Sequence, residues 1–469
     1  MDVTIQSQIQ SPLVRTLQSI PTNSANYVYG IPDNTPPFSR TQIRVQSTTG
    51  EESDLNAARV FKIPQFGRLN RAYLKYRCNG LQDTFSRVTT QYTDNVFSFS
   101  EGIEYVELRS HNSTIQRIYS DAIPFEAIST TGSENNLKRV LQGLAGYLGI
   151  TGGIKDEPAI FSQPARQGEA TFSDEDEYAV RDYLIPIPLA STFYLKDNLQ
   201  TRLMEDLEIV VKTRRASNQF QPLISQVQYP GSGTHELELV LDFINFHESV
   251  EEVIRNENFK PDIPATLLQS DYLLYKANYL RSEPANGSSS FTALTYEASL
   301  PTDALVTNLY IVPYMRTPGY EYRRPIQLTK GSLKFELLSS GESIISGYKH
   351  EYDGIESQNY STVTRQYQNE STLPLRWSSA GTHIRLGLNN TDEYFDGGIS
   401  FSSLIDAKMR ITYTILNSSP LIIQTDVGSN ETTTIDVNPE LISFDVCLKH
   451  KVLLRIDGNT GKISKSLES

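Results

Sequence analysis

Residues 102–119 read GIEYVELRSHNSTIQRIY, and residues 331–348 read GSLKFELLSSGESIISGY. Aligned without a gap, the two windows share Gly102/Gly331, Glu107/Glu336, Leu108/Leu337, Ser110/Ser339, Ile115/Ile344 and Tyr119/Tyr348. Val106 and Phe335 fall on the same side of a period-2 strand as the matched leucines, which is typical of a strand with one buried face. The two windows therefore predict that one β motif occurs twice in the chain.

Two further pairs of segments flank these windows in the same order. Residues 69–77 (LNRAYLKYR) have a counterpart at 306–314 (VTNLYIVPY). Residues 206–213 (DLEIVVKT) have one at 406–413 (DAKMRITY). The difference in residue number between the two members of a pair varies from pair to pair, as expected if loops of unequal length separate equivalent strands. A repeat this long exceeds the ~20–50 residues of a solenoid unit, so the chain is predicted to contain two copies of one β domain.

The rest of the sequence has the pattern of an all-β protein with few short helices in its loops. The segment 235–243 alternates strongly, with Leu237, Leu239 and Leu241 on one face. The clearest helical pattern covers 133–149. Short strands separated by turn-rich loops favour antiparallel sandwiches, and they are predicted at 183–189, 207–211, 235–243, 272–280, 305–314, 332–338, 409–416, 441–448 and 451–456.

The composition of the N-terminal residues and the positions of prolines predict three regions in the chain. Residues 1–45 are rich in Gln, Ser, Thr, Asn and Pro without periodicity, and we interpret them as an N-terminal arm. Two prolines in the segment 260–264 mark a junction. The first sandwich is therefore expected over 46–257 and the second over 258–469.

Bulk composition excludes several classes of protein. The formal charge is −13, and the densest basic run, Lys212-Thr-Arg214-Arg215, is too small for a phosphate-binding surface, so direct nucleic-acid binding is not expected. No apolar run is long enough to cross a bilayer and the N-terminal residues do not resemble a signal peptide, so membrane insertion is not expected either. The two cysteines, Cys78 and Cys447, fit a reducing compartment.

We find no constellation of residues that would carry catalysis. The six histidines, at 111, 235, 247, 350, 383 and 450, are scattered singly, and no nucleophile motif or phosphate loop is present. The acidic run at 173–177 lacks the alternating ligands and turn glycine of a calcium loop. We therefore expect no catalytic, cofactor-binding or metal residues, and a protein that is not an enzyme. Seven N-x-S/T sequons occur, at Asn112, Asn286, Asn359, Asn369, Asn389, Asn417 and Asn430.

Several stretches resemble, in order, the double jelly-roll major capsid proteins of icosahedral double-stranded DNA viruses, including nucleocytoplasmic large DNA viruses and virophages. Residues 63–69 with 73–75 are similar to an early strand of that family, although Arg68 stands where an acid is usual. Residues 103–119 resemble the strand pair that follows. Residues 184–189 resemble its proline-rich strand, and residues 242–248 resemble the end of the first jelly roll.

This resemblance implies two tandem antiparallel jelly-roll sandwiches and a structural role in a virion shell. It implies a homotrimer that forms a pseudo-hexagonal capsomer, with neighbouring capsomers and minor capsid or penton proteins as partners. The location implied is the virion capsid, assembled in the host cytoplasm or another reducing compartment. Two alternatives stay open, which are a carbohydrate-binding or glycoside-cleaving β-sandwich, and a minor capsid or scaffold protein on the same fold. The 55 acidic residues leave the glycosidase alternative possible.

Overall fold

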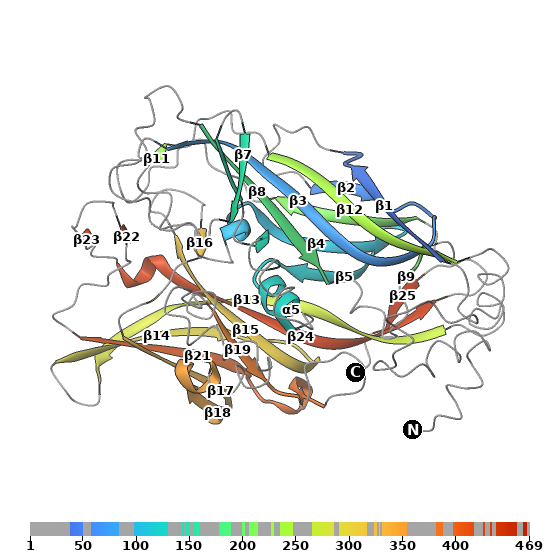
Figure 1. Cartoon of the computed structure of the whole chain (residues 1–469). Coiled ribbons are helices and arrows are strands. Elements are labelled where there is room, and N and C mark those ends of the chain that lie inside the picture. The colour runs from blue at the N-terminus through green and yellow to red at the C-terminus, as the bar shows by residue number, and fades with distance from the viewer. Residues whose placement is uncertain are drawn as a thin grey trace, which may run out of the picture.

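The structure is a computed structural model of the chain, shown in Figure 1. It describes residues 38–49, 58–83, 98–129, 140, 143–144, 147–150, 153–158, 178–188, 199–201, 206–213, 227–228, 235–246, 265–285, 290–316, 323–325, 328, 331–353, 381–387, 397–416, 425–426, 432–433, 438–456 and 463–466.

The first sandwich consists of two antiparallel sheets. The larger has the order β1 (Phe38–Gln46), β12 (His235–Phe246), β3 (Arg68–Asp83), β8 (Tyr178–Ile187), β6 (Tyr147–Ile150) and β7 (Gly153–Pro158), with β9 (Leu199–Gln200) and β11 (Val227–Gln228) also paired to β3. The smaller has the order β2 (Ala58–Lys62), β10 (Leu207–Thr213), β4 (Ile103–Ser110) and β5 (Ser113–Tyr119). Leu74 and Leu239 of the larger sheet and Val106 and Ile209 of the smaller are fully buried in one core.

The second sandwich is a single sheet folded over on itself. Its order is β16 (Arg323–Pro325), β15 (Leu305–Arg316), β24 (Ile442–Ile456), β13 (Ala265–Pro284), β14 (Phe291–Ser299), β21 (Lys408–Leu416), β17 (Ser332–Ser339) and β18 (Glu342–Tyr348), with β19 (Thr382–Arg385) and β20 (Ile399–Ser400) paired to β15 and β25 (Ile463–Ser466) paired to β24. Tyr296 of β14 and Phe444 of β24 meet edge to face at 5.0 Å. The two halves of the sheet therefore enclose a second core.

Short elements complete the described chain. They are η1 (Ser98–Glu101), α5 (Ile123–Ser129), η5 (Phe401–Ser403), η6 (Pro439–Leu441), and the hairpin of β22 (Thr425–Asp426) with β23 (Thr432–Thr433). In Figure 1 the first sandwich, blue to green, lies above the second, yellow to red, and α5 lies between them. The all-β fold with few short helices is thus confirmed.

The duplicated stretch forms the same hairpin in both sandwiches. Glu107 pairs with Arg117 across β4 and β5, and Glu336 pairs with Ser346 across β17 and β18, so equivalent residues keep equivalent partners. In both hairpins the register shifts two residues before the end of the first strand, after Leu108 or Leu337. Both turns have positive φ at their two central residues, as tight hairpins require.

The other two pairs of segments are equivalent in register as well. Val210 lies opposite Glu107 in the first sandwich, and Arg410 lies opposite Glu336 in the second. Asp206 and Asp406, which precede these strands, share the same positive φ of 49°. The pairings of β3 with β12 and of β15 with β24 are both interrupted by one bulged residue, at matched positions. The predicted duplication is therefore confirmed strand by strand.

Three expectations need correction. Residues 38–45 do not belong to an arm, because they form most of β1 and pair with β12; the remainder of 1–45 lies outside the described residues. The strands expected at 441–448 and 451–456 are one strand, β24. The helix expected over 133–149 is helical at 140, 143 and 144, but residues 147–150 form β6. Local propensity there yields to pairing with β8.

Gly331, one of the two matched glycines, occupies a position that no other residue fits. Its φ is +123°, and a Cβ there would lie 2.5 Å from the carbonyl oxygen of Thr414. We expect Gly331→Ala to lower the free energy of unfolding by about 2–3 kcal/mol, since both the backbone strain and the contact oppose it. Urea denaturation measures the loss. Gly341→Ala is the control, because its φ is +84° but no atom lies within 4 Å of the added Cβ; strain alone predicts about 1 kcal/mol. Equal losses in the two variants would contradict this account.

Candidate functional site

The residues that the sequence singled out for chemistry do not come together. Within the described residues, no group of three or more His, Cys, Asp or Glu side chains is arranged to hold a metal. His111 contacts Asp206 at 3.2 Å in a surface turn, and His350 stacks on Tyr348. His383 and His450 are buried. His247, the acidic run 173–177, Arg214, Arg215 and Trp377 lie outside the described residues, as does the side chain of His235.

Of the seven sequons, the structure describes one. Asn112 is exposed in the β4–β5 turn, where its φ is 63°. The other six asparagines lie outside the described residues. As for the membrane, the described helices include none with the length and hydropathy needed to cross a bilayer.

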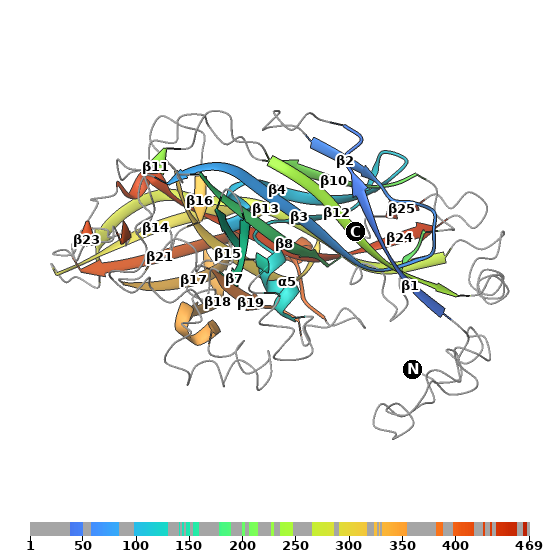
Figure 2. The ribbon, with the colours of Figure 1, turned by 45° about the horizontal axis from the view of Figure 1, so that its top comes forward.

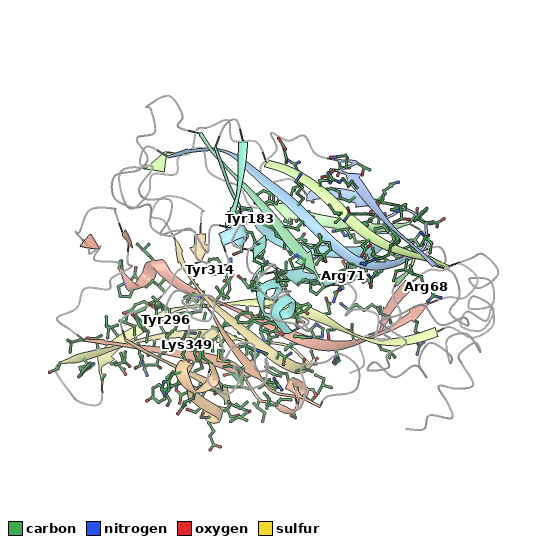
Figure 3. The ribbon with its side chains drawn as sticks, viewed as in Figure 1. Arg68, Arg71, Tyr183, Tyr296, Tyr314 and Lys349 are labelled. Atoms are coloured by element: carbon green, nitrogen blue, oxygen red, sulfur yellow. The ribbon has the colours of Figure 1, made fainter. Side chains whose placement is uncertain are left out.

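The most developed arrangement of polar side chains lies between the two sandwiches. We call it the inter-sandwich interface, formed by β5, η1 and α5 on one side and by β13, β15, β19, β24 and β25 on the other. The core of the first sandwich continues across it and includes Tyr272, Tyr310, Tyr314, Cys447 and Leu454 of the second. Figure 3 shows Tyr314 at this interface, whereas Tyr296 and Lys349 lie within the second sandwich. The first core thus extends into the second sandwich, which also encloses its own core.

An ion pair sits at the centre of the inter-sandwich interface. Lys449 Nζ of β24 lies 3.0 Å from Glu126 Oε1 of α5, and the two side chains are 3% and 2% exposed. The hydroxyl of Tyr310 donates to the same carboxylate oxygen at 2.6 Å. Phe125 stacks on the Tyr310 ring, with the two ring centroids 5.0 Å apart. Since each buried charge has both an opposite charge and hydrogen bonds, the pair is of the kind a protein interior tolerates.

Two more carboxylates accept hydrogen bonds from the opposite sandwich. Asp121 accepts a hydrogen bond from the hydroxyl of Tyr314. Asp271 of β13 accepts one from the backbone N–H of Arg117 at 2.8 Å and also pairs with Lys465 of β25. The side-chain amide of Gln116 donates to the carbonyl of Ser270 at 3.0 Å. The edge of β5 is therefore bonded directly to β13.

The pKa values of two groups at this interface, His383 and Cys447, are shifted so that the uncharged form is favoured. Burial, together with the charges of Arg385 and Lys449, holds the pKa of His383 well below its ordinary value. Burial, reinforced by nearby carboxylates including Asp121, raises the pKa of the Cys447 thiol well above its ordinary value. His383 is therefore a neutral imidazole packed against Tyr310, and Cys447 is a protonated thiol.

Sequence reasoning did not find this interface. Lys449 and His450 interrupt an apolar pattern, which suggested a break between two strands. In the structure both are buried side chains of β24, and Lys449 reaches Glu126 of the other sandwich. A long strand pattern containing a lysine and a histidine is the signal that could have indicated a buried polar contact.

Two surfaces equivalent to this interface are exposed in the single chain. One is the β18 edge, comprising Ile344, Ile345, Ser346 and Tyr348 at the end of the second sheet; the side chains of Ile344 and Tyr348 are 44% and 40% exposed. The other is the β1 face, comprising Arg40, Gln42 and Arg44 with the partly buried Tyr73, on the outer side of the larger first sheet. Figures 1 and 2 both show β1 and β18 lying apart on different sandwiches.

Two sandwiches of the same strand order, joined through a buried interface, define the double jelly-roll fold of viral major capsid proteins, and this chain has that fold. No family model and no curated protein sequence matches it. It is similar to VP54 of PBCV-1, fitted into a reconstruction of the virophage Sputnik, with a TM-score of 0.56 and 10% identity over 94% of this chain and 99% of that one. It is also similar to a quasi-atomic model of the PBCV-1 capsid, with a TM-score of 0.57 and 11% identity over 94% of this chain and 99% of that one. The similarity to the Sputnik virophage structure has a TM-score of 0.50 and 12% identity over 92% of this chain and 89% of that one.

Proposed function

We propose that this chain is a structural subunit of an icosahedral virus shell and that it assembles as a homotrimer. The observation that carries the proposal is the register-matched duplication of the sandwich. Three such chains present six similar sandwiches about a threefold axis, which gives a pseudo-hexagonal tile that packs in a plane. The similarity to the PBCV-1 and Sputnik capsid structures over nearly the whole of their chains supports the same role.

The proposal also assigns the domains of the chain, its partners and its location. Each sandwich is one domain, and the junction falls between β12 and β13, where no described residue pairs the two sheets. The joined sandwiches form the rigid tile. Neighbouring tiles and minor capsid or penton proteins are its partners, and the virion capsid is its location.

Native mass spectrometry of the purified chain tests this proposal. We expect a species at three times the monomer mass of 52.8 kDa. Obligate interfaces of the required kind bury about 2,000 Å² or more per pair of subunits, so the trimer should persist on dilution. Negative-stain electron microscopy of the same sample should show threefold particles with a hexagonal outline. A monomer that shows no tendency to assemble at micromolar concentration would contradict the proposal.

A further inference from the structure

Two basic side chains lie beside one carboxylate where β25 meets the inter-sandwich interface. Asp271 of β13 forms an ion pair with Lys465 of β25 through its Oδ2 atom. The Nε2 atom of His450 in β24 lies 3.9 Å from the same oxygen, which is longer than a hydrogen bond. The other carboxylate oxygen, Oδ1, accepts the backbone N–H of Arg117 from β5. One carboxylate therefore connects β13, β25 and the first sandwich, with an imidazole next to it.

The two basic side chains differ in how freely they can move. His450 is 3% exposed, and its backbone is paired on both sides, with Asp271 of β13 and with Val306 of β15. The side chain of Lys465 is 25% exposed, and β25 is a four-residue strand at the side of β24. The imidazole is therefore fixed next to Asp271, whereas the ammonium group can move into water.

The charged groups that act on His450 are Asp271 of β13 and Lys465 of β25. Other basic side chains on β5 and β24 have partners of their own: Arg117 binds Glu107 at 2.9 Å, Lys449 binds Glu126 at 3.0 Å, and Lys451 donates to the Ser270 hydroxyl at 3.3 Å. We therefore treat the occupancy of the Asp271 carboxylate as a balance between the lysine and the histidine.

Protonation of His450 and binding of Lys465 oppose each other. Burial lowers the pKa of His450, the Asp271 carboxylate counteracts part of this effect, and the Lys465 ammonium adds to it, so that the pKa lies below its ordinary value of 6.5. By linkage, a protonated His450 weakens the Lys465 contact by the factor by which Lys465 opposes protonation. The closed arrangement is therefore fully stabilised above pH 6.5, and part of that stability is lost as the pH falls from 6.5 toward the pKa of the folded chain.

We infer that Asp271 is the switch point of a pH-sensitive latch, which holds Lys465 and strand β25 in neutral solution and pairs instead with protonated His450 in mildly acidic solution. Once Lys465 is displaced, β25 keeps its short ladder to β24 but loses its hold on the first sandwich, where it lies against β5. In Figure 1 β25 lies at one end of the interface, so the latch opens that end and leaves the pair of Lys449 and Glu126 in place. The inference concerns a single chain and does not depend on the proposed trimer.

Hydrogen exchange of the full chain, followed by mass spectrometry at about pH 7.5 and about pH 5.5, tests the latch. Exchange times are scaled for the intrinsic pH dependence of amide exchange. The peptide that contains β25 is expected to lose protection on acidification, by up to about tenfold per pH unit for one linked proton. Peptides from β14 should keep their protection. Equal protection of β25 at the two pH values, or a loss shared by β14, would overturn the inference.

Substitution of the histidine distinguishes the latch from a general effect of acid. His450→Asn leaves a polar side chain that stays uncharged, so β25 is expected to be equally protected at both pH values. His350→Asn is the matched control, because His350 is exposed and stacks on Tyr348 of the second sandwich; in this variant the loss of protection in acid should remain. If the loss also remains in His450→Asn, the histidine is not the switch and the inference is wrong.

Substitution of the lysine gives a measurement that leaves the buried histidine unchanged. In Lys465→Met the pKa of His450 should rise, because the ammonium group that lowers it is gone. Exchange of the imidazole C2 hydrogen, followed by mass spectrometry against pH, reports this pKa in the full chain. β25 should also be poorly protected at both pH values. Lys408→Met, on β21, is the control and should leave the pKa of His450 unchanged. Equal pKa values of His450 in the two variants would overturn the inference.

Discussion

Replacing Lys449 with methionine is expected to lower the free energy of unfolding by about 3–5 kcal/mol, the cost of leaving one charge of a buried pair without its partner. Glu126 would remain 2% exposed with the Tyr310 hydroxyl as the sole remaining donor among the contacts described above. The loss should appear in urea denaturation followed by circular dichroism. Lys408→Met is the control, because its pairs with Glu297 and Asp406 are exposed to solvent and the loss there should be much smaller.

The double variant Glu126→Leu/Lys449→Met distinguishes ionic pairing from loss of packing. Replacing both partners of a buried pair with apolar residues is often neutral or stabilising. We therefore expect the double variant to be more stable than Lys449→Met alone, with a coupling energy of about 1–3 kcal/mol. If the two losses simply add, the pair does not act as a unit.

Replacing Glu107 with glutamine is expected to destabilise the protein by about 3 kcal/mol, although the matched change at Glu336 should cost less than about 1 kcal/mol. The Glu107 carboxylate is fully buried and accepts hydrogen bonds from Arg109 at 2.6 Å, Thr114 at 2.5 Å and Arg117 at 2.9 Å. Glu336 is partly exposed and pairs with Lys334 alone among the described ion pairs. Chemical denaturation of the two variants side by side measures the difference, and equal losses would contradict it.

The pH dependence of stability also tests the contribution of the Glu107 carboxylate. Burial opposes ionisation of Glu107, but the hydrogen bonds from Arg109 and Thr114 and the charge of Arg117 outweigh it, so the pKa of Glu107 falls below its ordinary value of 4.5. A carboxyl group with a lowered pKa stabilises the fold fully above that ordinary value, and the contribution is lost as pH falls through the folded pKa. Below pH 4.5, Glu107→Gln should therefore lose less stability with falling pH than the unmodified chain does.

The sequence predicted the strands better than it predicted the contact between the two sandwiches. Alternation placed Leu237, Leu239 and Leu241 of β12 on one buried face, and all three are buried. The repeat predicted two equivalent hairpins because backbone pairing constrains residues locally, at glycines and at alternating apolar positions. Neither of those signals depends on the rest of the fold.

The contact between the sandwiches was not predicted, for a physical reason. Glu126 and Lys449 are separated by 323 residues. Glutamate and lysine are residue types usually found on the protein surface. Only the packing of α5 against β24 makes them partners. Similarly, Ile115 and Ile344 are identical residues in matched strands, and their exposures diverge because a neighbouring sandwich covers one of them. Sequence periodicity does not contain that information.

The long separation between Glu126 and Lys449 also bears on synthesis. At roughly 5–20 residues per second, a ribosome adds residue 449 about 15–65 s after residue 126. Until then Glu126 has no cation and the aromatic face of the second sandwich is incomplete, so a nascent or truncated chain exposes surface that chaperones and proteases recognise. Chains that end before β24 lack the cation of this buried pair, and they are expected to be less stable than the full chain.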